Sequence, residues 1–166
     1  MALDMYLSFD GNKKIKGESK AENFVDQIEI LAWSWGASQS ATTHYGEGSG
    51  AGQANIQDLS VTKWVDAGSA GILQCCVAGE HIPEVVLTMC KAGGIDNKQK
   101  PFLKLTLTDA IITSYSTGGS GGEDRLTENI SINFAKVKFE TLKQDKKGVI
   151  APSGTASYDI PAKKVS

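Results

Sequence analysis

The stretch LTENISINF, residues 126–134, decides the fold class because the side chains of one parity are mainly apolar. Strict alternation of this kind is typical of a β-strand with one buried face. Just beyond it, Val137 and Phe139 lie on the opposite parity, so we expect a β-bulge near Ala135. The residues that share the first face are Leu126, Glu128, Ile130, Ile132 and Phe134.

Similar patterns on the N-terminal side of this stretch predict further strands. Residues 67–78 are the exception, because their apolar side chains follow the three-and-four spacing of a helix. Several short strands with Gly-rich connections favour a mainly β fold, a small antiparallel β-barrel or two-sheet sandwich with one α-helix. The expected strands cover residues 2–9, 28–35, 54–65, 85–90 and 100–115.

The length of 166 residues, with 40% hydrophobic and 22% charged residues, predicts a single domain over residues 1–166. No repeat or linker divides it. Residues 144–166 form a Lys-rich and Gly-rich tail that stays unassigned, apart from a short candidate strand near residues 158–160.

Residues 37–53 are expected to form a long protruding loop, since glycines at every second position make a strand or helix unfavourable. Long loops without structure of their own are usually functional. In an assembling protein such an arm often reaches a neighbouring subunit, so we predict assembly contacts here. The residues assigned to these contacts are His44, Tyr45, Gly46, Gly48 and Gly50.

The charge balance argues against a nucleic-acid partner. Seventeen basic residues face nineteen acidic ones, and Arg125 is the single arginine. The N-terminus lacks the features of a secretory signal, and no apolar run is long enough for membrane insertion. Three cysteines, an odd number, fit reduced thiols, so we expect the chain to fold in the cytoplasm.

The candidate chemistry is weak, and we predict no enzymatic activity, cofactor or metal. The glycine clusters lack the Lys-Ser or Lys-Thr of a nucleotide loop. Cys75, Cys76, His81 and Cys90 lack the spacing of a zinc site. A Cys–His dyad is formally available, but His44 lies in the expected loop.

Several stretches together resemble the Hcp family of type VI secretion tube proteins over residues 2–140. The most specific is GGSGGEDRLTEN, residues 118–129, which continues into NFAKV, residues 133–137. The others are GESK at residues 17–20, LAWSWG at residues 31–36, and VLT at residues 86–88 followed by KAGG at residues 91–94.

The resemblance implies a homo-hexameric ring of two-sheet β-barrels, similar to phage tail-tube proteins. Rings would stack into a tube that a contractile sheath drives outward, with a spike protein at its tip and effector toxins in its lumen. The protein would then be cytoplasmic before firing and secreted without a signal peptide.

Two sets of residues receive roles within this picture. Arg125 follows Glu123 and Asp124, and a bidentate ion pair within its own subunit or with the next is expected at the interface. Ser34 alternates with Trp33 and Trp35, so it faces the channel as a cargo contact if the indoles are in the core.

Two alternatives stay open. One is a phage-like tail-tube subunit, which sequence barely separates from a secretion tube. The other, from a different class, is a monomeric β-barrel that binds a small apolar ligand in an interior cavity.

Overall fold

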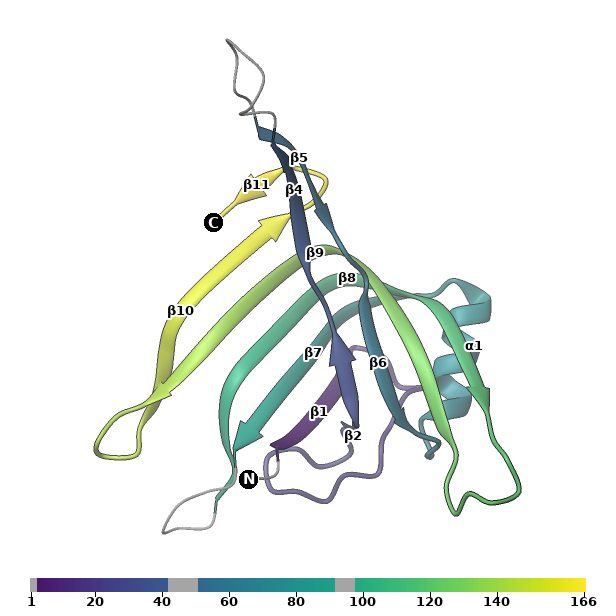
Figure 1. Cartoon of the computed structure of the whole chain (residues 1–166). Coiled ribbons are helices and arrows are strands. Elements are labelled where there is room, and N and C mark those ends of the chain that lie inside the picture. Colours follow the sequence, from purple (N-terminus) through teal and green to yellow (C-terminus); the bar gives the residue numbers. More distant parts are fainter. Residues whose placement is uncertain (1–2, 42–50, 92–97) are drawn as a thin grey trace.

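A computed structural model describes residues 3–41, 51–91 and 98–166. The described chain is mainly antiparallel β-structure with one helix, which confirms the predicted class (Figure 1). The elements are β1 (Leu3–Asp10), β2 (Ile28–Glu29), β3 (Ala32–Ser34), β4 (Ala37–Ala41), β5 (Ala51–Ile56), β6 (Leu59–Trp64), α1 (Ser69–Ala78), β7 (His81–Lys91), β8 (Lys100–Gly118), β9 (Thr127–Gln144), β10 (Ile150–Asp159) and β11 (Lys164–Val165).

The main sheet runs in the order β11-β10-β9-β8-β7-β1-β2, and β6 joins it by pairing with β9. β3 pairs with β6. The long strands β8 and β9, of 19 and 18 residues, extend through both halves of the sheet. The sheet curves around the core but is not closed into a barrel.

The strand predicted over residues 28–35 is divided between two parts of the sheet. Ile28 pairs with Leu7 of β1, whereas Trp33 pairs with Val61 of β6. The link between them changes partners residue by residue, since the Ile30 N–H donates to Met5 O and the Leu31 N–H donates to Thr62 O. This segment therefore connects the two sides of the core.

The alternation of buried and exposed residues breaks at the same level in three neighbouring strands. Thr108 and Ala110 of β8 pair with Lys136 and Phe134 of β9, so Asp109 and Ala135 lie between two regular rungs. Pro83 of β7 lies at the same level, because its neighbours Glu84 and Ile82 pair with Thr108 and Ala110 of β8. We call the line through Pro83, Asp109 and Ala135 the crease.

The crease replaces the bulge that was predicted near Ala135. The change of parity is real, since Phe134 and Val137 are both buried, but the register between β8 and β9 does not shift there. Asp109 has a φ of 52°, in the left-handed region. One residue out of alternation in each strand lets the sheet bend while its apolar side chains stay on the core side.

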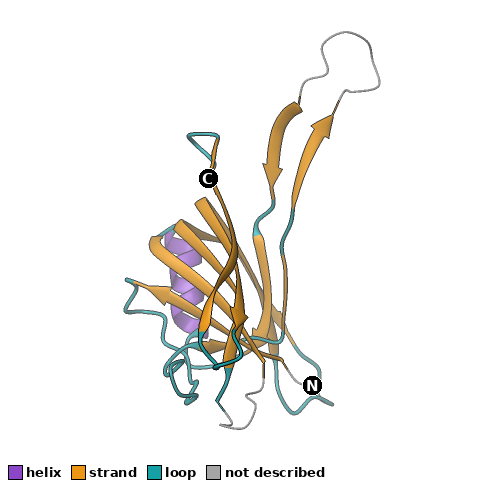
Figure 2. Ribbon diagram, turned by 90° about the vertical axis from the view of Figure 1, so that its left-hand side faces the viewer, coloured by secondary structure: helices purple, strands orange, loops and turns teal. Residues whose placement is uncertain are grey.

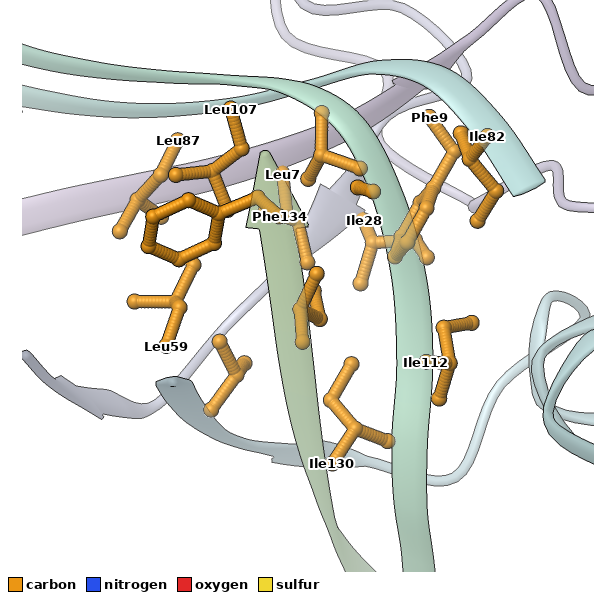
Figure 3. Close-up of a cluster of buried hydrophobic side chains, with 14 of the residues drawn as sticks. Leu7, Phe9, Ile28, Leu59, Ile82, Leu87, Leu107, Ile112, Ile130 and Phe134 are labelled. Atoms are coloured by element: carbon orange, nitrogen blue, oxygen red, sulfur yellow. The ribbon is translucent and has the colours of Figure 1, made fainter. Parts of the chain in front are cut away.

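The core fills the space inside this bend (Figure 3). Leu87 and Leu107 come from one side of the crease, and Leu59, Ile112 and Ile130 come from the other; all five are at most 2% exposed. Helix α1 adds Ile72 and Cys75, which are fully buried. Cys75 therefore acts as a small core residue.

β4 and β5 form a separate two-stranded hairpin that stands away from the body (Figure 2). The prediction that residues 37–53 lack strands is therefore wrong for 37–41 and 51–53. A Cβ at Gly52 would lie 1.9 Å from the Ser40 hydroxyl oxygen, so this glycine permits close pairing rather than preventing a strand. His44, Tyr45, Gly46, Gly48 and Gly50 lie outside the described residues.

Most of the unassigned tail belongs to the sheet. β10 pairs with the C-terminal half of β9, with Tyr158 opposite Val137, and Tyr158 packs against the core. β11 then pairs with β10 through Asp159 and Lys164. The weak periodicity of β10 has a physical reason, because residues 151–156 are all exposed, on both faces.

Replacing Asp109 with Ile is expected to lower the free energy of unfolding by about 1–2 kcal/mol, since a β-branched residue is strained at this φ. Asp109→Gly is the control and should change stability little, because its exposed contact with His81 contributes little. Chemical denaturation at one protein concentration measures both. Equal costs for the two variants would contradict a strained crease.

Candidate functional site

Beyond the crease, four strands form a unit in the order β3-β6-β9-β8. Ser34 of β3 lies opposite Ser60 of β6, and Ser60 lies opposite Ser131 of β9. Ser131 in turn lies opposite Ser114 of β8, which completes a row of four serines. Within the described ranges, β3 and residues 112–118 of β8 pair on one side alone, so the unit has two open edges.

The outward side of this unit is lined by small, uncharged side chains, and we call it the hydroxyl face. Next to the serine row, the Thr62 hydroxyl donates to Asn129 Oδ1 at 2.7 Å. Ala32 and Ser116 extend this second row on either side. The hydroxyl face comprises Ala32, Ser34, Ser60, Thr62, Ser114, Ser116, Asn129 and Ser131.

The chemistry of the hydroxyl face is that of a hydrated surface. Hydroxyl and amide groups both donate and accept hydrogen bonds, but they carry no charge and bury no apolar area. Asp58 lies at its border, where it accepts hydrogen bonds from Asn133 and Thr113 at 2.8 and 3.1 Å. The face therefore suits transient contact with many molecules better than tight binding of one.

Ser34 was predicted to face away from the core if the two neighbouring indoles pack into it, and the structure has this arrangement. Trp33 and Trp35 pack against the core, and Ser34 is exposed on the other side of the strand. Its contact with a channel or with cargo stays a prediction.

A buried ion pair lies beneath the hydroxyl face. Lys63 of β6 and Glu128 of β9 lie directly opposite each other on the core side, and both are fully buried. Lys63 Nζ forms an ion pair with Glu128 Oε1. Lys63 Nζ also donates to Trp64 O at 2.8 Å and to Asp66 Oδ1 at 3.1 Å. Burial of two charges is favourable only with such complete hydrogen bonding.

The same network holds the start of helix α1. The Ser69 hydroxyl donates to Glu128 Oε1 at 2.7 Å and accepts from the Asp66 N–H at 2.9 Å. Tyr115 of β8 donates to the other oxygen of Glu128. Partial burial and the carboxylate of Glu128 raise the pKa of Tyr115 to about 12, so the phenol remains a donor at neutral pH.

Sequence reasoning missed this network, although a signal was present. Glu128 shares its parity with Leu126 and Ile130, and Lys63 shares its parity with Leu59 and Val61. A charged residue on each of two apolar strand faces indicates a buried pair once the strands are known to be neighbours.

The three residues predicted to form interface ion pairs lie together at one end of the molecule. Glu123, Asp124 and Arg125 line a cleft of about 410 Å³ beside Trp64 and Thr127. The Arg125 guanidinium lies over the Trp64 ring, 4.5 Å from its centroid. Within the described part of this chain Arg125 forms no ion pair, so the pair with the next subunit remains the prediction.

Within the described residues, the three cysteines and His81 do not form a reactive cluster. All three cysteines are free, and burial raises the pKa of Cys90 to about 11. His81 contacts Asp109 at the surface, with 2.8 Å between Nδ1 and Oδ1. Among residues 3–41, 51–91 and 98–166, no three His, Cys, Asp or Glu side chains lie close enough to hold a metal ion. No helix in these ranges has the length and hydrophobicity to cross a membrane.

Comparisons with known proteins agree on one family. The family model described as "Type VI secretion system effector, Hcp" matches residues 6–140. The protein hcp1 of Pseudomonas aeruginosa is 46% identical over 148 residues, which cover 89% of this chain and 88% of that protein.

Solved structures give the same result for the fold. A type six secretion system protein superposes with a TM-score of 0.87 at 30% identity, covering 99% of this chain and 100% of the other. Hcp1 from Salmonella typhimurium superposes with a TM-score of 0.78 at 33% identity, covering 100% of both chains.

Replacing Lys63 with Met is expected to lower the free energy of unfolding by about 3–5 kcal/mol, because Glu128 is then buried without its cation. Adding Glu128→Gln should recover about half of the loss or more, since a neutral amide still accepts from Ser69 and Tyr115. Chemical denaturation of the single and double variants measures this.

The matched control is Lys14→Met, which removes the surface ion pair between Lys14 and Glu80. It should have little effect. A double variant that is less stable than Lys63→Met would show that the network does not behave as a coupled charge pair.

Proposed function

We propose, because this chain belongs to the Hcp family of the type VI secretion system, that six copies close into a ring and that rings stack into the secretion tube. The tube protein is assembled in the cytoplasm and expelled by a contractile sheath, with a spike protein at the tip. Effector toxins travel in the lumen. Its role is structural, and the fold carries it without any cofactor.

The observation that carries this proposal is the pair of open edges on the four-stranded unit. β3 exposes unpaired backbone groups on one side, and residues 112–118 of β8 expose them on the other. Open edges favour pairing with another chain. Because the two edges differ, pairing of one with the other is heterologous and generates a ring when the rotation closes.

The hydroxyl face would then line the lumen of that ring. When the edges join, the rows of serine, threonine and asparagine continue from copy to copy. An uncharged, well-hydrated wall allows proteins of either net charge to pass and holds none of them tightly. Ser34 lies at the β3 edge of this wall, where it contacts cargo near the junction of two subunits.

The β4–β5 hairpin supports stacking. A two-stranded hairpin is marginally stable by itself, and every residue of β4 is exposed. The hairpin therefore gains its stability from a neighbour. Ring or inter-ring contacts by His44, Tyr45, Gly46, Gly48 and Gly50 complete this proposal.

The test of ring formation is the solution mass by light scattering across a concentration series. We expect six times the chain mass of 17.6 kDa, because edge pairing leaves no open edge in a closed ring. Circular dichroism provides the control that the sample is folded. A folded monomer at every concentration would contradict the ring and favour the ligand-binding alternative.

Replacing residues 38–55 with an Asn-Gly turn is expected to keep the subunit folded but to abolish stacking of rings. The Gln57 N–H already donates to Gly36 O at 3.0 Å, so the body is closed at the base of the hairpin. Thermal unfolding should change little, and electron microscopy should show single rings in place of tubes. Unchanged tubes would remove the hairpin from the assembly.

A further inference from the structure

Charge is unevenly distributed along the chain. Residues 136–166 contain seven lysines and three acidic residues, a net charge of +4 in a chain whose total is −2. Residues 3–135 contain most of the acidic side chains. The C-terminal half of β9, together with β10 and β11, is therefore a basic side of a weakly acidic protein.

The basic side contains a hollow of about 490 Å³ on the outward face of the sheet. We call it the lysine hollow, because Lys104 of β8 and Lys136 and Lys138 of β9 line it. Lys138 forms an ion pair with Glu140, with 3.5 Å between Nζ and Oε1. Among the described residues, Lys104 and Lys136 form no ion pair. The other residues that line the lysine hollow are Glu84, Thr106, Thr108, Glu140, Ser157 and Ser166.

The complementary charge lies around Trp64, at the opposite end of β9. The cleft that holds Glu123 and Asp124 continues into a second cleft of about 180 Å³ beside Glu18 and Glu29. In the described part of the chain these four carboxylates form no ion pair, and Arg125 is the one cation at the rim.

The two charged surfaces are too far apart to meet within one chain. Lys136 lies nine positions beyond Thr127 on β9, on the order of 30 Å at the rise of a strand. The turn at residues 119–126 projects from the far end of this strand (Figure 1). A chain with unlike surfaces at its two ends forms heterologous contacts.

We propose that the turn carrying Glu123 and Asp124 docks in the lysine hollow of a second copy of this chain. Carboxylates meet ammonium groups there, and the Thr and Ser hydroxyls beside them complete the hydrogen bonding. This contact rests on the proposed assembly. It involves a second pair of surfaces, separate from the open strand edges. Charge complementarity sets which faces meet and how fast they associate.

The experiment reverses charge on each surface and then on both. Lys104→Glu with Lys136→Glu should weaken assembly about tenfold or more, and Glu123→Lys with Asp124→Lys should do the same. The chain carrying all four changes restores complementarity between copies and should return to within about threefold of the original dissociation constant. Analytical ultracentrifugation in low salt measures each.

Two controls separate folding and general charge effects from this contact. Lys146→Glu with Lys147→Glu reverses two exposed lysines in the β9–β10 turn and should leave assembly unchanged. Lys104→Gln with Lys136→Gln removes the charge without repulsion from Glu140, and it should weaken assembly less than reversal does.

The possible outcomes are distinct. Assembly of the unaltered chain with no rescue in the fourfold variant would overturn the docking contact and leave the ring intact as a proposal. Failure of the unaltered chain to assemble at all would overturn both. Rescue of a weakened assembly supports the contact between the turn and the lysine hollow.

Discussion

The bend at the crease is the constraint on which the rest of the structure depends. A regular β-strand presents alternate residues to one face, and strands as long as β8 and β9 would otherwise extend past any core of this size. Because Pro83, Asp109 and Ala135 fall out of alternation at one level, both halves of the sheet contact the same apolar core. Because β7 begins only at His81, opposite Ile111 of β8, residues 112–118 are left as an open edge.

The buried Lys63–Glu128 pair has a specific place in this arrangement. It joins β6 to β9 directly under the hydroxyl face. Through Ser69 and Tyr115 it also fixes the start of α1 and the C-terminal part of strand β8. An apolar pair would hold two strands together as well, but it would not set their register through directed hydrogen bonds. The network thereby orients the strands that carry both open edges.

The local periodicity of the sequence predicts most of the strands of the fold but little of the candidate site. The alternation in β8 and β9 is visible in sequence because each strand buries one face over most of its length. The β4–β5 hairpin and β10 were missed or left unassigned because their exposed residues impose no pattern. The row Ser34–Ser60–Ser131–Ser114 depends on pairing between strands distant in sequence, which no single stretch encodes.

The proposed tube would require two kinds of surface to be kept apart. Contacts between copies need unlike charges and unpaired edges, whereas a channel wall needs to attract nothing strongly. In this chain β9 carries both kinds. Asn129 and Ser131 belong to the uncharged face, Lys136 and Lys138 belong to the lysine hollow, and the crease at Ala135 separates the two groups. The same bend that builds the core therefore keeps the proposed contact surface, the lysine hollow, away from the proposed lumen wall, the hydroxyl face.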